Sequence, residues 1–135
     1  MSLINESIIC LITVLHLLVI IFIICTPFTD SNYLLLMHTI IIPFIIMHWY
    51  LNNNTCSLTV AEQYLRQKTT GKPVNNDDCF TYKFIAPIYD FNKNHEDFSF
   101  FTYTAIIGLW LVSLSKLILK YNNGKIQSFQ DLVVI

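Results

Sequence analysis

Charged residues are scarce in this sequence, and their scarcity excludes several classes of protein. Aspartate, glutamate, lysine and arginine make up 13% of the 135 residues, against about 25% in a typical soluble domain. The formal net charge is −1, so the basic surface that nucleic-acid-binding proteins carry is not expected. The composition therefore disfavours a soluble enzyme and a nucleic-acid partner. The length suffices for a single domain, residues 1–135.

Closely spaced cysteine pairs are missing as well. The four cysteines are Cys10, Cys25, Cys56 and Cys79, and no CxxC or CxxH pair occurs among them. This spacing argues against a zinc knuckle, and we predict neither a metal site nor a cofactor from these residues. A disulfide between Cys56 and Cys79 requires that their shared loop faces an oxidising compartment, and the sequence leaves that open.

Long apolar runs are what the chain has in abundance. Three runs cover residues 7–25, 33–51 and 100–119; the first two carry no charge and the third carries one lysine. About 20 apolar residues are enough to cross the hydrocarbon core of a bilayer, and such a run must be helical there. The sequence therefore predicts an all-α membrane protein with three transmembrane helices. A loop, 52–99, precedes the third helix, and a tail, 120–135, follows it.

Signals at the ends of these runs suggest their arrangement. The first run lacks a basic flank and a small-x-small cleavage site, so we interpret it as a retained span and not as a signal peptide. Pro27 follows it closely and predicts a tight turn into the second run, which makes a helical hairpin. Pro43 lies inside the second run and should kink it. A small excess of basic residues in loop 52–99 favours a cytosolic N-terminus and loop.

The long loop contains its own helical signal. Thr59 and Glu62 have the spacing of a capping box, which predicts a short interfacial helix over about Val60–Gln67. Glu62 and Arg66 lie four residues apart and are expected to form an ion pair along that helix. The aromatic segment Cys79–Phe91 is too short to span a bilayer and is typical of an interfacial or re-entrant piece.

Three histidines in the first two spans are the candidate binding residues. Folding the hairpin about its turn places His38 near the depth of Val19 or Ile20. His16 would then lie about one helical turn, or about 5 Å, away. Facing histidines can ligate haem or another metal, whereas a neutral intramembrane histidine more often hydrogen-bonds a neighbouring helix. His38 and His48 point in different directions on one helix, and no residue is predicted to be catalytic.

The third span is expected to pack against the hairpin through small residues. Gly108, Ser113 and Ser115 would permit the close approach that membrane helices need. Lys116 lies near the end of this span and is expected to extend toward the interface. The spans contain no acidic residue, and three helices are too few for a pore within one chain, so a channel or transporter is disfavoured.

A series of residues along the chain resembles a known family. The matching positions are His38, Pro43, His48, Trp49, Cys56, Leu58, Thr59, Glu62, Leu65, Arg66, Gly71, Phe84, Ile85, Pro87 and Tyr89. They resemble a family of uncharacterised small three-span membrane proteins whose bacterial members carry C-P-L-T-x-x-E-x-x-L-R. The form in this chain looks more like members encoded by large double-stranded DNA viruses. Ser57 departs from the family's proline, and the spacing from tryptophan to cysteine differs.

The resemblance implies a location more than an activity. It suggests a non-enzymatic structural or assembly component of a virion's internal membrane, or of an infected cell's membrane. Its partners would be the lipid bilayer and other membrane or capsid proteins, contacted through the long loop or the tail. The alternative is a small redox or haem- or metal-binding membrane subunit that uses His16, His38 or His48. The sequence decides neither the oligomeric state nor the partner.

Overall fold

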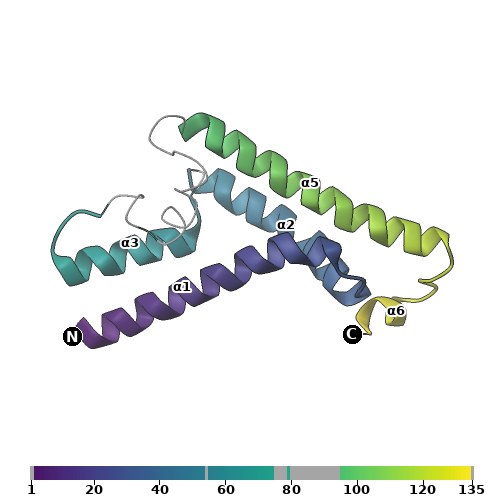
Figure 1. Cartoon of the computed structure of the whole chain (residues 1–135), viewed down its shortest axis with the longest axis horizontal. Coiled ribbons are helices and arrows are strands. Elements are labelled where there is room, and N and C mark those ends of the chain that lie inside the picture. The colour runs from purple at the N-terminus through teal and green to yellow at the C-terminus, as the bar shows by residue number, and fades with distance from the viewer. Residues whose placement is uncertain (1, 54, 75–78, 80–94, 135) are drawn as a thin grey trace. The chain divides into compact units, whose positions relative to one another are not determined.

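The computed structural model describes residues 2–53, 55–74, 79 and 95–134. Every regular element in these ranges is helical, which confirms the predicted all-α class. In chain order (Figure 1) the elements are α1 (Ser2–Cys25), the short 3-10 helix η1 (Thr26–Phe28), α2 (Asn32–Leu51), α3 (Ser57–Thr70), α5 (His95–Asn122) and α6 (Phe129–Val133).

Three of these helices are long and apolar enough to cross a membrane, as the apolar runs predict. The candidate spans are Leu3–Phe28, Asn32–Leu51 and Phe100–Asn122. Only 11%, 17% and 17% of the residues in their most apolar windows are buried within the protein. Most of their apolar side chains therefore face outward, which suits a protein with lipid as its solvent. These features support an integral, multi-pass membrane protein.

Proline and glycine lie at the ends of two helices, and a further proline lies inside a third. α1 ends at Cys25 and continues into η1, with Pro27 in its first turn. Pro43 lies inside α2, and the helix runs on to Leu51. α3 ends at Gly71, whose left-handed backbone (φ 68°) lets its N–H donate to the Gln67 carbonyl at 2.8 Å.

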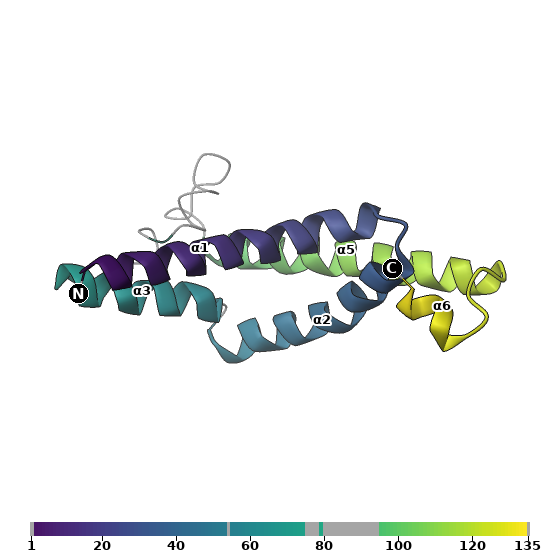
Figure 2. The same ribbon diagram turned by 90° about the horizontal axis from the view of Figure 1, so that it is seen from below.

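The chain forms two compact units, which we describe separately. The α3 unit comprises Met1–Val19 and His48–Phe100, and the α5 unit comprises Ile20–Met47 and Phe101–Ile135. In the α5 unit, α5 lies beside α2 (Figures 1 and 2), and hydrogen bonds from two of its side chains join the two helices. Its buried apolar side chains are few: Ile23, Leu35, Ile42, Ile106 and Ile126. A core this small leaves an important role to the buried polar groups.

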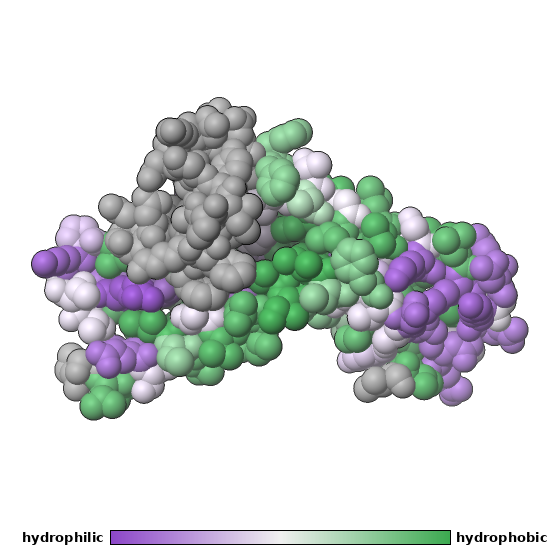
Figure 3. Space-filling view, viewed as in Figure 1, coloured by the Kyte–Doolittle hydropathy of each residue, from purple (hydrophilic) through white to green (hydrophobic). Residues whose placement is uncertain are grey.

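Lysines near the end of α5 bind the turn between α1 and α2. Lys116 donates to the Thr29 carbonyl at 3.2 Å, and Lys120 donates to the Asn32 side chain at 2.8 Å. Asn32 in turn donates to the Asp131 carbonyl in α6 at 3.1 Å. Hydrophilic residues gather at this end of the unit (Figure 3). The first loop and the tail thus lie together, as the three-span topology requires.

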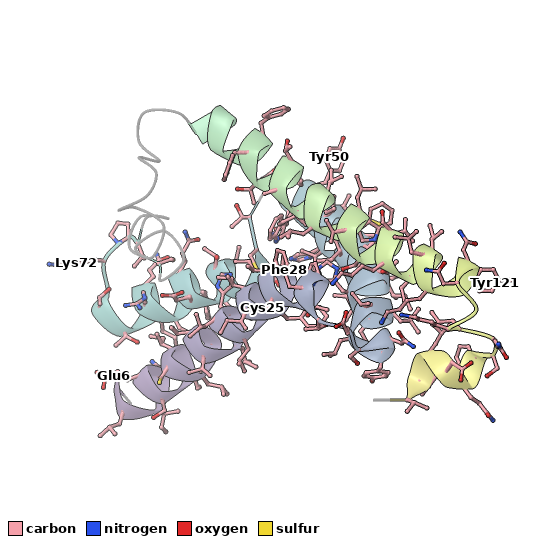
Figure 4. The ribbon with its side chains drawn as sticks, turned by 45° about the vertical axis from the view of Figure 1, so that its right-hand side comes forward. Glu6, Cys25, Phe28, Tyr50, Lys72 and Tyr121 are labelled. Carbon is pink, nitrogen blue, oxygen red and sulfur yellow. The ribbon has the colours of Figure 1, made fainter. Side chains whose placement is uncertain are left out.

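Several sequence predictions concern residues that the structure does not describe. Pro87 and Tyr89 lie outside the described residues, as does the segment Cys79–Phe91 apart from Cys79 itself. All four cysteines are free thiols, so Cys56 and Cys79 are not joined. Cys10 and Cys25 are exposed on α1, and Figure 4 shows Cys25 at the end of that helix.

Candidate functional site

The candidate site is built around His38, which is fully buried in the α5 unit. One ring nitrogen, Nε2, lies 3.0 Å from the Ile23 carbonyl at the end of α1. The other, Nδ1, lies 2.9 Å from the Ser113 hydroxyl on α5. The Phe22 ring contacts the imidazole, with 5.7 Å between the centroids. A single side chain on α2 therefore connects segments of two other helices, an arrangement that we call the histidine bridge.

Pro27 explains why the Ile23 carbonyl is available to this bridge. In an α-helix the carbonyl of residue i accepts from the N–H of residue i+4, and the residue four positions after Ile23 is Pro27, which has no N–H. A carbonyl without a donor is costly in an apolar environment. His38 Nε2–H supplies the missing donor. In the neutral tautomer that carries its proton on Nε2, Nδ1 accepts the hydroxyl proton of Ser113.

A second proline produces the same situation on α2. Pro43 deprives the Thr39 carbonyl of its i+4 donor, and the indole Nε1–H of Trp110 on α5 donates to that carbonyl at 2.9 Å. We call this contact the tryptophan bridge. The sequence predicted a kink at Pro43 but did not identify Trp110. The proline four residues after Thr39 was the available signal, since it announces a carbonyl in need of a donor.

The tryptophan bridge can be tested with a double-mutant cycle. Trp110→Phe keeps the aromatic packing and removes the N–H, so we expect it to lower the free energy of unfolding by about 1 kcal/mol. Pro43→Ala restores a backbone N–H for the Thr39 carbonyl, and in that background the same change should cost close to nothing. Reversible unfolding in mixed detergent micelles would measure both. Equal costs in the two backgrounds would show that Thr39 does not depend on Trp110.

Of the three small residues predicted to pack α5 against the hairpin, one is buried and two are exposed. Ser113 is buried, as expected of a residue that packs against the hairpin. Gly108 and Ser115 are exposed, and a Cβ built on Gly108 would meet no atom within 4 Å. Their predicted packing role is therefore wrong. Because the hydrogen bonds of Ser113 and Trp110 fix which face of α5 turns inward, Gly108 and Ser115 are left on the outer side.

A second polar cluster lies in the α3 unit. Glu62 is fully buried and its carboxylate is 2.8 Å from Arg66 Nε, which confirms the predicted ion pair. Thr59 is also buried, and its carbonyl accepts from the thiol of buried Cys79 at 3.9 Å. His16 is nearly buried and interacts electrostatically with Glu62. Five residues thus meet on the inner side of α3: His16, Thr59, Glu62, Arg66 and Cys79.

The predicted capping box at the start of α3 is wrong. The helix begins at Ser57, before Thr59, and its N-cap is Cys56, which makes no side-chain capping bond. His48 takes the capping role, because its Nε2 accepts the Ser57 N–H at 3.1 Å. That N–H belongs to the first turn and has no acceptor within the helix, so the imidazole supplies one from the end of α2.

The sequence-predicted residues therefore divide into several environments. His38 holds the α5 unit together, His48 caps α3, and His16 belongs to the buried cluster of the α3 unit. Trp49, Cys56 and Leu58 are half-buried in the same unit. Within the described ranges, no three His, Cys, Asp or Glu side chains come together so as to hold a metal ion. The His38 contact with Ile23 also places it nearer the turn than the predicted depth of Val19 or Ile20.

The tail offers a pH-dependent contact outside the spans. The Asp131 carboxylate accepts the backbone N–H groups of Gln127 at 2.9 Å and Ser128 at 3.1 Å. These bonds lower the pKa of Asp131 below its usual value. Because the folded tail prefers the ionised carboxylate, its contribution is present above the ordinary aspartate pKa and is lost as the pH falls through the lowered pKa.

We expect Asp131→Asn to fray α6 at neutral pH. The neutral amide oxygen accepts the two backbone N–H groups more weakly than the carboxylate does, so NMR backbone shifts of Phe129–Val133 should move toward unfolded values. The unsubstituted protein should show the same change only on acidification below the ordinary range of aspartate, about pH 3.9. The variant's tail should be insensitive to that titration. Unchanged α6 shifts in the variant would contradict the assignment.

Comparisons of the chain with models of protein families, with curated proteins and with solved structures each found no match. What the protein does must therefore be inferred from its own residues. Several of these residues are buried polar groups that form hydrogen bonds or ion pairs with one another or with the backbone. In the part of the chain that the structure describes, no buried side-chain nitrogen or oxygen is left without a hydrogen bond.

Proposed function

We propose that this protein is a non-enzymatic structural or assembly component of a membrane. The observation that carries the proposal is the histidine bridge, in which both ring nitrogens of His38 are occupied by helix-to-helix hydrogen bonds. A histidine that binds haem or a metal needs a nitrogen lone pair for the ligand, and a histidine that transfers protons needs access to a donor or acceptor outside the protein. His38 is engaged in packing on both sides.

A second hydrogen bond between helices fits the same role. The tryptophan bridge also joins two helices, and it supplies a donor to a backbone carbonyl that lacks its helical one. In a bilayer, hydrogen bonds between helices and close packing hold a bundle together, since lipid chains do not drive helices together as water does. A rigid bundle of this kind suits a protein that occupies a fixed place among neighbours.

The resemblance to viral members of the three-span family suggests which membrane this is. On that basis the protein belongs to a virion's internal membrane or to a membrane of the infected cell. It would contact capsid proteins or other membrane proteins through loop 52–99 or through the tail. This location depends on the resemblance and not on any contact within the chain.

The proposal is tested by the composition of the native particle that carries the protein. After gentle extraction, mass spectrometry should find many copies in fixed stoichiometry with structural or capsid proteins. The absorption spectrum of the same sample should show no chromophore. A scarce monomer in the membrane, or one haem or metal ion per chain, would contradict the proposal. The second result would favour the alternative, a redox or ligand-binding subunit.

Variants of the histidines separate the two functions further. Glutamine offers one hydrogen-bond donor and one acceptor in place of the two imidazole nitrogens, but it ligates haem iron poorly. A structural protein carrying glutamine at His16, His38 and His48 should still assemble into its particle. A haem-binding subunit with the same changes should fold and lose its chromophore.

A further inference from the structure

Two polar side chains of α3 face inward, and two large apolar side chains of the same helix face outward. Thr59 and Glu62 are 2% and 0% exposed, whereas Val60 is 44% and Tyr64 is 64% exposed. A helix that faced water would place the valine inside and the carboxylate outside. The reversed arrangement indicates that the outer face of α3 meets an environment that accepts apolar groups.

The charge of the outer face is positive. Val60, Tyr64 and Lys68 follow one another at intervals of four residues and so share one face of the helix. Lys72 follows Gly71, the C-cap of the helix, and projects away from it (Figure 4). The negative charge of Glu62 is already paired with Arg66. The two lysines therefore give the exposed surface of α3 its charge.

The same face adjoins the end of a candidate membrane span. α2 ends at Leu51, which is 74% exposed, and only residues 52–56 separate it from α3. Five residues reach at most about 18 Å, so α3 begins close to the end of α2. An open groove of about 600 Å³ is lined in part by Leu51, Val60 and Tyr64. The apolar side chains of α2's end and of α3 thus form one continuous surface.

We propose that the outer face of α3 contacts a membrane that contains anionic phospholipids. Val60 and Tyr64 insert beside the span end, acyl carbons fill the groove at Leu51, and Lys68 and Lys72 contact lipid phosphates. Aromatic residues favour this level of the bilayer, and lysines extend toward charged headgroups. Buried Glu62, paired with half-buried Arg66, holds the helix in this orientation.

Insertion of the outer face is tested with the full chain in nanodiscs containing brominated phosphatidylcholine. The extra tryptophan of Tyr64→Trp, obtained as the difference from the parent emission, should be quenched. Thr70→Trp is the matched control, because Thr70 is exposed on the same helix but lies on another face. We expect about twofold stronger quenching for Tyr64→Trp, since its ring reaches the acyl boundary. Equal quenching of the two variants would overturn the proposal.

The role of charge is tested by hydrogen exchange of the α3 amides. Exchange should be slower in nanodiscs with phosphatidylserine than in phosphatidylcholine alone, by roughly fivefold for each lysine engaged. The double variant Lys68→Glu, Lys72→Glu should lose this dependence. Lys125→Glu, the same charge change at an exposed position in the tail, should keep it. Exchange that ignores lipid composition in the parent would refute the anionic-lipid assignment and leave the face to a protein partner.

Discussion

Replacing His38 with alanine is expected to lower the free energy of unfolding by about 3 kcal/mol. The imidazole is completely buried, so alanine leaves a cavity as well as two unpaired groups. Hydrogen bonds between membrane helices are modest, about 0.6 kcal/mol on average and at most about 1.7 kcal/mol. The two lost bonds alone therefore cannot account for the expected loss, and the cavity must supply the larger part.

Graded variants separate these contributions. Ser113→Ala removes one bond with little change in volume and should cost about 1 kcal/mol. His38→Gln fills most of the cavity and keeps a donor and an acceptor, so it should fall between that variant and His38→Ala. Met47→Ala is the matched control, because Met47 is exposed on the same helix. Reversible unfolding in mixed micelles measures all four. If His38→Ala costs no more than Met47→Ala, the histidine bridge contributes nothing.

Both bridges follow from one property of proline. Pro27 and Pro43 each leave a carbonyl without its helical donor, and in each case a side-chain N–H from another helix replaces it. One such need joins α2 to the end of α1 and the other joins α5 to α2, so the packing is specified by backbone needs and not by side-chain shape alone. A slip of α5 by one helical turn would leave both Ser113 and Trp110 away from their partners, so the contacts select one register.

The sequence predicted those features that depend on local composition. The three spans follow from unbroken apolar runs, which lipid forces into helices, and the turn after α1 follows from Pro27. The ion pair of Glu62 and Arg66 follows from the geometry of a helix, whatever surrounds it. These predictions needed no knowledge of what each helix contacts.

The features that sequence could not predict depend on contacts between distant segments. Thr59 and Glu62 fit a capping box, yet both face the interior of the α3 unit and His48, from another helix, provides the cap. Gly108 and Ser113 are both small residues, so the sequence alone predicts a packing role for each. Only the partner of Ser113 in α2 decides between them.

Replacing Arg66 with methionine is expected to lower the free energy of unfolding by about 3 kcal/mol. An exposed pair at this spacing would be worth only about 0.3–0.5 kcal/mol. The pair is not of that kind, because the Glu62 side chain is 0% exposed and the Arg66 side chain 33%. Removing the arginine leaves the carboxylate in the interior without that counterion, where an ionised group is costly.

Because Glu62 is buried and Arg66 is partly exposed, replacing one or the other should change the free energy of unfolding by different amounts. Glu62→Gln should cost less than Arg66→Met, because the guanidinium can turn toward its exposed side while the carboxylate cannot. The double variant should recover part of the loss, since it leaves no charge inside. Gln67→Met, at an exposed position of the same helix, should change stability by less than about 0.5 kcal/mol. A loss for Arg66→Met as small as that for Gln67→Met would show that the pair behaves as a surface pair. The ion pair would then not fix the orientation of α3, on which the proposed lipid-binding face depends.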